Sequence, residues 1–225
     1  MPERSRTLHS LTTPRAAALA GVLFAVLFAA SIFLIRSSLP EGAQPGSQWL
    51  EAGNDKIRLA AELMPFAGIS FLWFMGVVRA NLGRYEDKFL GTVTLGSGLL
   101  FLAMMFVSSA VGAGLAEASH YLGGSATGSG VGVFGQMLLL KLSKTYALRM
   151  AAVFMISLAT IWLRTGLMPR WLVACSYIAA LALVMGGGST MWLTLAFPLW
   201  VLIVSVLFLV RAGAFESHRD DPRDR

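Results

Sequence analysis

Four charged residues at the start of one apolar stretch have a spacing that suits ion or proton chemistry in a membrane. They are Glu51, Asp55, Arg58 and Glu62, at positions i, i+4, i+7 and i+11. At 100° per residue, these positions fall within an arc of about 60° on an α-helix. Charged side chains inside a membrane commonly mark ion, proton or ligand pathways. The four residues therefore form one charged stripe that ends at Glu62 and is a candidate functional site.

A second set of charged residues is basic and lies further along the chain. Lys141, Lys144 and Arg149 share one helical face with Thr145, within an arc of about 140°. The acidic and the basic set are expected to approach the membrane from the same side. Together they could bind or pass an ion, a proton or an anionic ligand.

Glu62 and Arg149 are predicted to lie at similar depth. Glu62 is 17 residues before Arg79, about 25 Å along a straight helix, and Arg149 is 15 residues before Arg164, about 22 Å. A lone charge at that depth costs up to about 2.5 to 3.5 kcal/mol on insertion scales, so we expect the two side chains to face each other or a wet cavity. The predicted intramembrane polar layer is Glu62, Arg149, Arg58 and Lys144, and the predicted outer charged stripe is Glu51, Asp55 and Lys141.

An architectural role for the same charges is a competing interpretation. Arg58 precedes Glu62 by four residues and could pair with it within one helix. Arg149 could extend to the membrane surface without a partner, or either charge could contact another subunit. Pro65 is expected to kink the helix just below Glu62 and to open space between helices.

A metal site is a weaker candidate. Glu117 and His120 have the Glu-x-x-His spacing of helical carboxylate metal sites, but the motif occurs once, and a solvated helix end is the simpler interpretation. His9 and His218 lie in the tails, so no pair of histidines is available in the apolar stretches to ligate haem. With Cys175 as the single cysteine, we predict no disulfide, no metal centre and no cofactor.

Six apolar stretches must position all of these residues. The 225 residues are 56% hydrophobic, and a membrane-spanning helix needs about 20 apolar residues. We predict an all-α, six-helix transmembrane bundle over residues 16–211, with a cytoplasmic tail over 1–15 and a disordered cytoplasmic tail over 212–225. The predicted spans are about 16–35, 59–78, 89–116, 144–163, 171–187 and 190–210.

Three of the stretches carry extra information. Residues 16–35 could be a signal peptide, but their apolar core exceeds the usual 7 to 15 residues, so an uncleaved helix is expected. In the third stretch, small residues predict close helix packing: Gly91, Gly96, Gly98, Ser108, Ser109, Gly112 and Gly114. Only 14 uncharged residues separate Arg149 from Arg164, so the fourth helix must extend back, to about residue 134.

Basic residues predict the orientation. With the N-terminus inside, the cytoplasm receives 12 of the 18 Lys and Arg residues, which favours cytoplasmic N- and C-termini. The net charge of +6 is then explained by lipid headgroups at the ends of the helices, and nucleic acid is not an expected partner.

Part of the sequence resembles known bacterial proteins. The segments ELMPFAGISFLWFMGVVR (62–79), GRYEDKF (83–89) and LGSGLLF (95–101) resemble a family of uncharacterised bacterial polytopic inner-membrane proteins, over roughly residues 50–110. The resemblance implies a multi-pass location in the bacterial cytoplasmic membrane and a shared helical core. It assigns no catalytic residue.

Three functions are compatible with the sequence. The leading hypothesis is a small transporter or permeation subunit that uses Glu62 and Arg149. The first alternative is a non-catalytic assembly or accessory subunit, a homo-oligomer or part of a membrane complex, because the last two spans offer only apolar surface. The second is an outward-facing metal-dependent membrane enzyme that uses Glu117 and His120.

Overall fold

Helices make up nearly all of the computed structural model, which describes residues 14–38, 49–82, 88–122, 130–186 and 191–217. No strand occurs in these residues, which confirms the predicted all-α class. The elements are α1 (Pro14–Ser38), α2 (Trp49–Leu82), α3 (Lys88–Leu122), α4 (Gly130–Lys141), the π-helix η4 (Leu142–Ala147), α5 (Leu148–Thr165), α6 (Arg170–Gly186), the 3-10 helix η5 (Met191–Leu195) and α7 (Ala196–Ser217).

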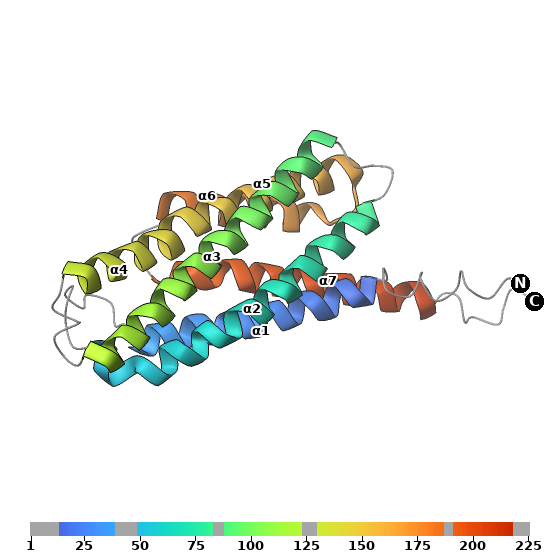
Figure 1. Cartoon of the computed structure of the whole chain (residues 1–225). Helices are drawn as coiled ribbons and strands as arrows, with labels where there is room; N and C mark the ends of the chain where they lie inside the picture. The colour runs from blue at the N-terminus through green and yellow to red at the C-terminus, as the bar shows by residue number, and fades with distance from the viewer. Residues whose placement is uncertain (1–13, 39–48, 83–87, 123–129, 187–190, 218–225) are drawn as a thin grey trace, which may run out of the picture.

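Five of the described helical segments are long and apolar enough to cross a membrane, as expected for a multi-pass membrane protein. They are Ala18–Ser38, Asp55–Ala80, Lys88–Ala118, Gly130–Thr165 and Leu193–Val210. The sixth apolar helix, α6, has 17 residues and a length of about 25 Å. In Figure 1, α1 begins and α7 ends at the same end of the bundle.

Several helices extend beyond their predicted spans. The fourth apolar stretch is one continuous helical run over Gly130–Thr165, slightly longer than the arginine spacing predicts. Pro65 lies inside α2 without ending it. α7 continues to Ser217, into the segment expected to be a disordered tail, because the residues after Arg211 are still largely apolar. The remaining tail residues and the glycine-rich segment 123–129 lie outside the described residues.

An aromatic cluster at mid-height holds the bundle together. Phe197 of α7 lies at its centre, with ring centroids 4.7 Å from Phe101, 5.6 Å from Phe71 and 6.0 Å from Phe24. Such ring pairs contribute about 0.5 to 1.5 kcal/mol each beyond the area that they bury. The aromatic core, as we name it, consists of the buried residues Phe24, Phe28, Phe71, Phe101, Phe154, Phe197 and Trp200.

Close helix contacts occur at some glycines and not at their neighbours. A Cβ on Gly98 would lie 2.2 Å from Met75 Sδ, and a Cβ on Gly112 would lie 3.0 Å from Leu139 Cδ1. No such neighbour lies within 4 Å of a Cβ on Gly96 or Gly114. The closest approach joins α1 to α7, where a Cβ on Gly21 would lie 1.9 Å from Ser205 Oγ.

Candidate functional site

The charged residues predicted from sequence are mostly on the surface of the bundle. Glu62, Arg58 and Arg149 are exposed, and in the part of the chain that the structure describes no hydrogen bond or ion pair joins Glu62 to Arg149. Lys144 differs from them because it is half-buried and lines a cavity.

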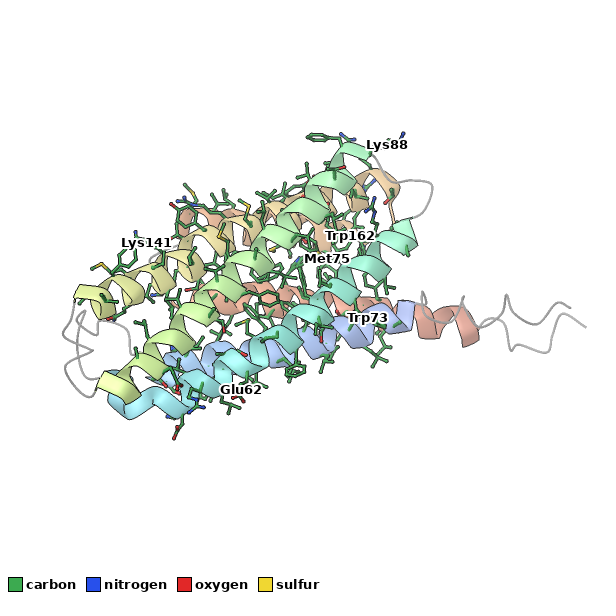
Figure 2. The ribbon with its side chains drawn as sticks, viewed as in Figure 1. Glu62, Trp73, Met75, Lys88, Lys141 and Trp162 are labelled. Carbon is green, nitrogen blue, oxygen red and sulfur yellow. The ribbon has the colours of Figure 1, made fainter. Side chains whose placement is uncertain are left out.

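The predicted outer stripe is likewise exposed where it is described. Asp55 and Lys141 are exposed, and the side chain of Glu51 lies outside the described residues. Figure 2 shows Glu62 and Lys141 on opposite flanks of the bundle, both towards the end away from Lys88. The two predicted stripes therefore do not converge on one site in this structure.

Two small cavities lie next to each other at the Lys144 end of the bundle. Each has a volume of about 10 Å³, the least that a water molecule requires. They share Ile35, Ser108, Ser109 and Leu139 as walls. Six elements thus meet around a space of one or two water molecules: α1, α2, α3, α4, η4 and η5.

The polar lining of the first cavity is unusual for so apolar a chain. We name its polar residues the Lys144 layer: Ser108, Ser109, Ser143, Lys144 and Thr194. All except Lys144 are buried. Because none of the described residues that line either cavity is acidic, the layer holds one formal positive charge and no negative one.

Two hydroxyls of the layer converge on one backbone carbonyl. Ser108 Oγ donates from α3 to Leu139 O across 3.1 Å, and Ser143 Oγ donates to the same oxygen across 2.7 Å. The Ser143 bond reaches the carbonyl four residues earlier in its own helical run, as the bonds of Ser31, Ser176 and Ser205 do, whereas the Ser108 bond joins two helices. Ser108 therefore ties α3 to α4 three residues before the π-helix begins.

Lys144 lies within a π-helical segment. η4 covers Leu142–Ala147 inside an otherwise α-helical run. Helix irregularities at membrane depth are tolerated where Ser and Thr side chains or water satisfy the backbone, and here Ser108 and Ser143 supply hydroxyls at the start of the segment. Short π-helical segments inside α-helices are frequent at functional sites.

Two groups of the layer remain available for a ligand. The Ser109 side chain is 9% exposed, lines both cavities, and its hydroxyl has no hydrogen-bond partner among the described residues. Lys144 lines the first cavity and brings three ammonium donors. A hydroxyl and an ammonium on one cavity favour a ligand that accepts hydrogen bonds.

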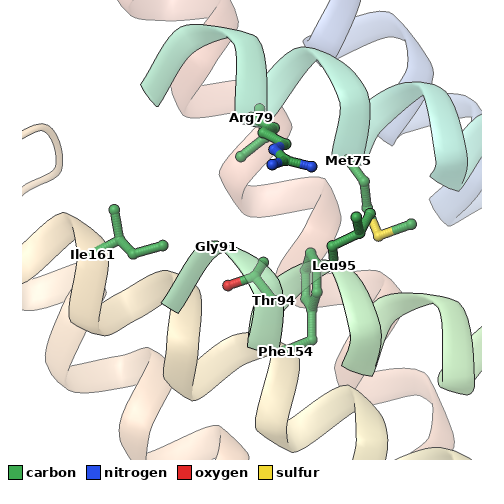
Figure 3. A pocket seen from close by; sticks show the side chains of 8 residues that line it. Met75, Arg79, Gly91, Thr94, Leu95, Phe154 and Ile161 are labelled. Carbon is green, nitrogen blue, oxygen red and sulfur yellow. The ribbon is translucent and has the colours of Figure 1, made fainter. Parts of the chain in front are cut away.

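A second cavity region lies at the opposite end of the bundle and is more apolar. It has a volume of about 20 Å³ and is lined by α2, α3 and α5. Figure 3 shows Arg79 and Thr94 beside it with Met75, Phe154 and Ile161. Thr94 Oγ1 already donates to Leu90 O at 2.8 Å, and Arg79 is exposed at the helix end, so this region is the weaker candidate.

The metal hypothesis gains no support from the described residues. Within them, no three His, Cys, Asp or Glu side chains gather to hold an ion. Glu117 is exposed, and the side chain of His120 lies outside the described residues, so this site stays a prediction.

Comparisons with protein-family models, with curated proteins and with solved structures found no match for the chain. The candidate site therefore depends on geometry. Sequence reasoning included Lys144 but treated Ser108 and Ser109 only as small packing residues. A usable signal was depth, because Ser108 lies 20 residues after Lys88 and Lys144 lies 20 before Arg164, both about 30 Å along a helix.

Proposed function

We propose that the chain is a six-pass protein of the bacterial cytoplasmic membrane that acts as a small transporter or permeation subunit through the Lys144 layer. Five long apolar segments and α6 give six crossings if the bilayer is thinned around α6. An even number of crossings agrees with α1 beginning where α7 ends. The excess of basic residues at that end supports cytoplasmic termini.

The observation that supports transport most directly is the half-buried Lys144 on a π-helical segment beside two water-sized cavities. Ionisable residues inside membrane bundles mark ion and substrate paths, and irregular helices line the cavities of transporters. Glu62 lies towards the same end of the bundle but on the exposed surface of α2, so the proposal rests on the Lys144 layer.

The small cavity volume indicates a closed state. Each cavity accommodates at most a water molecule, so passage of a solute requires the helices around the layer to separate. The aromatic core below it is filled with buried rings, and it would be the principal barrier.

Flux through reconstituted protein tests this proposal. Purified protein in sealed liposomes is assayed for proton, sodium, potassium, chloride and phosphate flux, with empty liposomes as the baseline. We expect protein-dependent flux of at least one probe, reduced at least tenfold by Lys144→Met. Lys56→Met removes an exposed lysine on α2 and is expected to keep the flux. Flux at the baseline for every probe, or equal flux in both variants, would contradict the proposal.

An assembly or accessory role is a second candidate, favoured by one surface feature. An open groove of about 370 Å³ runs between α1 and α2 and is lined almost wholly by apolar side chains, including Leu19, Leu23, Ile69 and Trp73. These four are exposed, so the groove faces lipid or another apolar helix.

Cysteine cross-linking separates lipid from protein in that groove. Cys175 is first replaced by serine, because it is exposed and would cross-link by itself. With an added oxidant, Ile69→Cys in this background is expected to form a disulfide-linked dimer in native membranes if a second copy of the chain occupies the groove. Ile203→Cys on α7 serves as an exposed control away from the groove. Equal cross-linking at both positions would argue against a specific subunit contact.

A further inference from the structure

We propose that the Lys144 layer binds a small monovalent anion of halide size, held by the Ser109 hydroxyl and the Lys144 ammonium group. This proposal names the substrate class of the site described above and rests on the proposed function for its role in transport. The proposed binding is supported by the unpartnered Ser109 hydroxyl and by the positive charge of Lys144.

Of the three serine hydroxyls around the cavity, two donate to a backbone carbonyl and one has no partner among the described residues. The hydroxyl protons of Ser108 and Ser143 are both directed to Leu139 O. The Ser109 hydroxyl is left without a partner among the described residues although its side chain is buried. A buried polar group without a partner destabilises the fold, so its presence favours a ligand that supplies the missing hydrogen bond.

Charge selects an anion over a cation. Lys144 lines the cavity, and no acidic residue is among the described residues that line either cavity. A cation held at membrane depth without a counter-charge is costly, and an anion beside it removes that cost. A metal cation would meet a positive ammonium and no carboxylate.

Size selects a monatomic ligand. The cavities are about 10 Å³ each and share four wall residues, so a polyatomic anion does not fit. Fluoride is about as large as a water molecule and fits one cavity as it stands, whereas chloride or bromide requires the shared wall side chains to move apart. The remaining lone pairs of Ser108 Oγ and Ser143 Oγ are suited to receive hydrogen bonds from a water molecule. Water in both cavities, with no anion, is the competing occupancy.

Anion-dependent thermal stability tests the binding. Purified protein is transferred to gluconate buffer, and chloride, bromide or fluoride is titrated in at constant ionic strength while the unfolding temperature is followed. A ligand that binds the folded protein raises this temperature in a saturable way, by a few degrees at high occupancy. We expect that rise for at least one halide.

Matched variants assign the rise to the site. Lys144→Met and Ser109→Ala should abolish it, Lys144→Arg should retain part of it, and Lys56→Met should leave it unchanged. If Lys144→Met does not fold, Ser109→Ala alone decides, because it removes one oxygen from a small side chain. The proposal is overturned if no halide raises the unfolding temperature of the parent protein, or if Ser109→Ala and Lys144→Met show the same rise as the parent. Either result leaves water as the occupant.

The same samples distinguish this proposal from the transport proposal. Saturable halide binding without any flux in liposomes supports the anion site and overturns transport. Flux of a cation or proton without halide binding overturns the anion site and leaves the transport proposal standing.

Discussion

The aromatic core and the Lys144 layer share helix α3 but differ in how their side chains pack. In the core, Phe24, Phe71 and Phe101 of α1, α2 and α3 pack around Phe197 without a polar partner. In the layer, α3 presents Ser108 and Ser109 to a helix that has changed to π geometry. Buried rings fill the core, whereas the layer combines hydroxyl groups with two small cavities.

This difference has a physical basis in the membrane environment. Lipid is as apolar as a buried phenylalanine, so helices associate through close packing and interhelical hydrogen bonds rather than through the exclusion of water. Filled regions such as the core should therefore carry the stability of the bundle. Regions with voids lose contact energy and should contribute little.

The largest expected effect is at the centre of the core. Phe197→Ala removes a fully buried ring that contacts four other phenylalanines and Trp200, and we expect a loss of about 3 to 5 kcal/mol in unfolding free energy. Unfolding by denaturing detergent, followed by circular dichroism, measures it. Phe33→Ala removes an exposed ring of α1 and should change the unfolding free energy by less than about 0.5 kcal/mol. Similar losses in both variants would show that the core is not the stabilising region.

The next largest effect is expected where α1 meets α7. A Cβ on Gly21 would overlap Ser205 Oγ and approach Phe74 Cδ2 to 2.8 Å, so Gly21→Ala should destabilise the bundle by about 1 to 3 kcal/mol. Gly76→Ala is the control, because no heavy atom lies within 4 Å of the added Cβ, and it should be neutral or stabilising.

A double variant makes this prediction sharper. Ser205→Ala removes the oxygen that collides, leaving Ser205 Cβ 3.1 Å from the new Cβ of Gly21→Ala. The double variant should therefore recover part of the loss in melting temperature. If it is no more stable than Gly21→Ala alone, the close approach of α1 and α7 is not the cause.

A smaller effect is expected at the hydrogen bond that links the core to α6. Trp200 Nε1 donates to Ser176 Oγ at 2.8 Å, and both side chains are buried. Ser176→Ala leaves the indole N–H without this acceptor, so we expect a loss of about 1 kcal/mol in unfolding free energy. Ser70→Ala removes a hydroxyl that bonds only within its own helix and should cost less. Equal melting temperatures for the two variants would show that the bond to α6 adds nothing.

The sequence was sufficient to predict the helices but not how they face each other. Apolar stretch length and the spacing of Arg149 and Arg164 predicted the long fourth helix, because both depend on the thickness of the bilayer. The same arithmetic placed Glu62 and Arg149 at one depth. Depth along a helix does not determine which way a side chain points around the helix axis. In the structure both side chains are exposed.

The candidate site was only partly predictable for a related reason. Lys144 was identified because it is charged within an apolar helix. Ser109 was not, since a serine in a membrane helix usually satisfies its hydroxyl on the preceding turn, as Ser31 and Ser205 do. Only the positions of neighbouring helices reveal that Ser109 lacks such a partner, and a change from α to π geometry at η4 has no signature in the apolar pattern.

The smallest expected effect distinguishes the layer from the core most directly. Ser109→Ala removes a buried hydroxyl that has no partner among the described residues, so in halide-free buffer it should leave the unfolding free energy unchanged or raise it by up to about 1 kcal/mol. Ser108→Ala removes the bond to Leu139 O and should lower it by about 0.6 to 1 kcal/mol. Melting curves of the two variants, compared side by side with the parent protein, measure the difference. A clear loss of stability in Ser109→Ala would mean that its hydroxyl already stabilises the fold, and the layer would then resemble the core instead of a site kept open for a ligand.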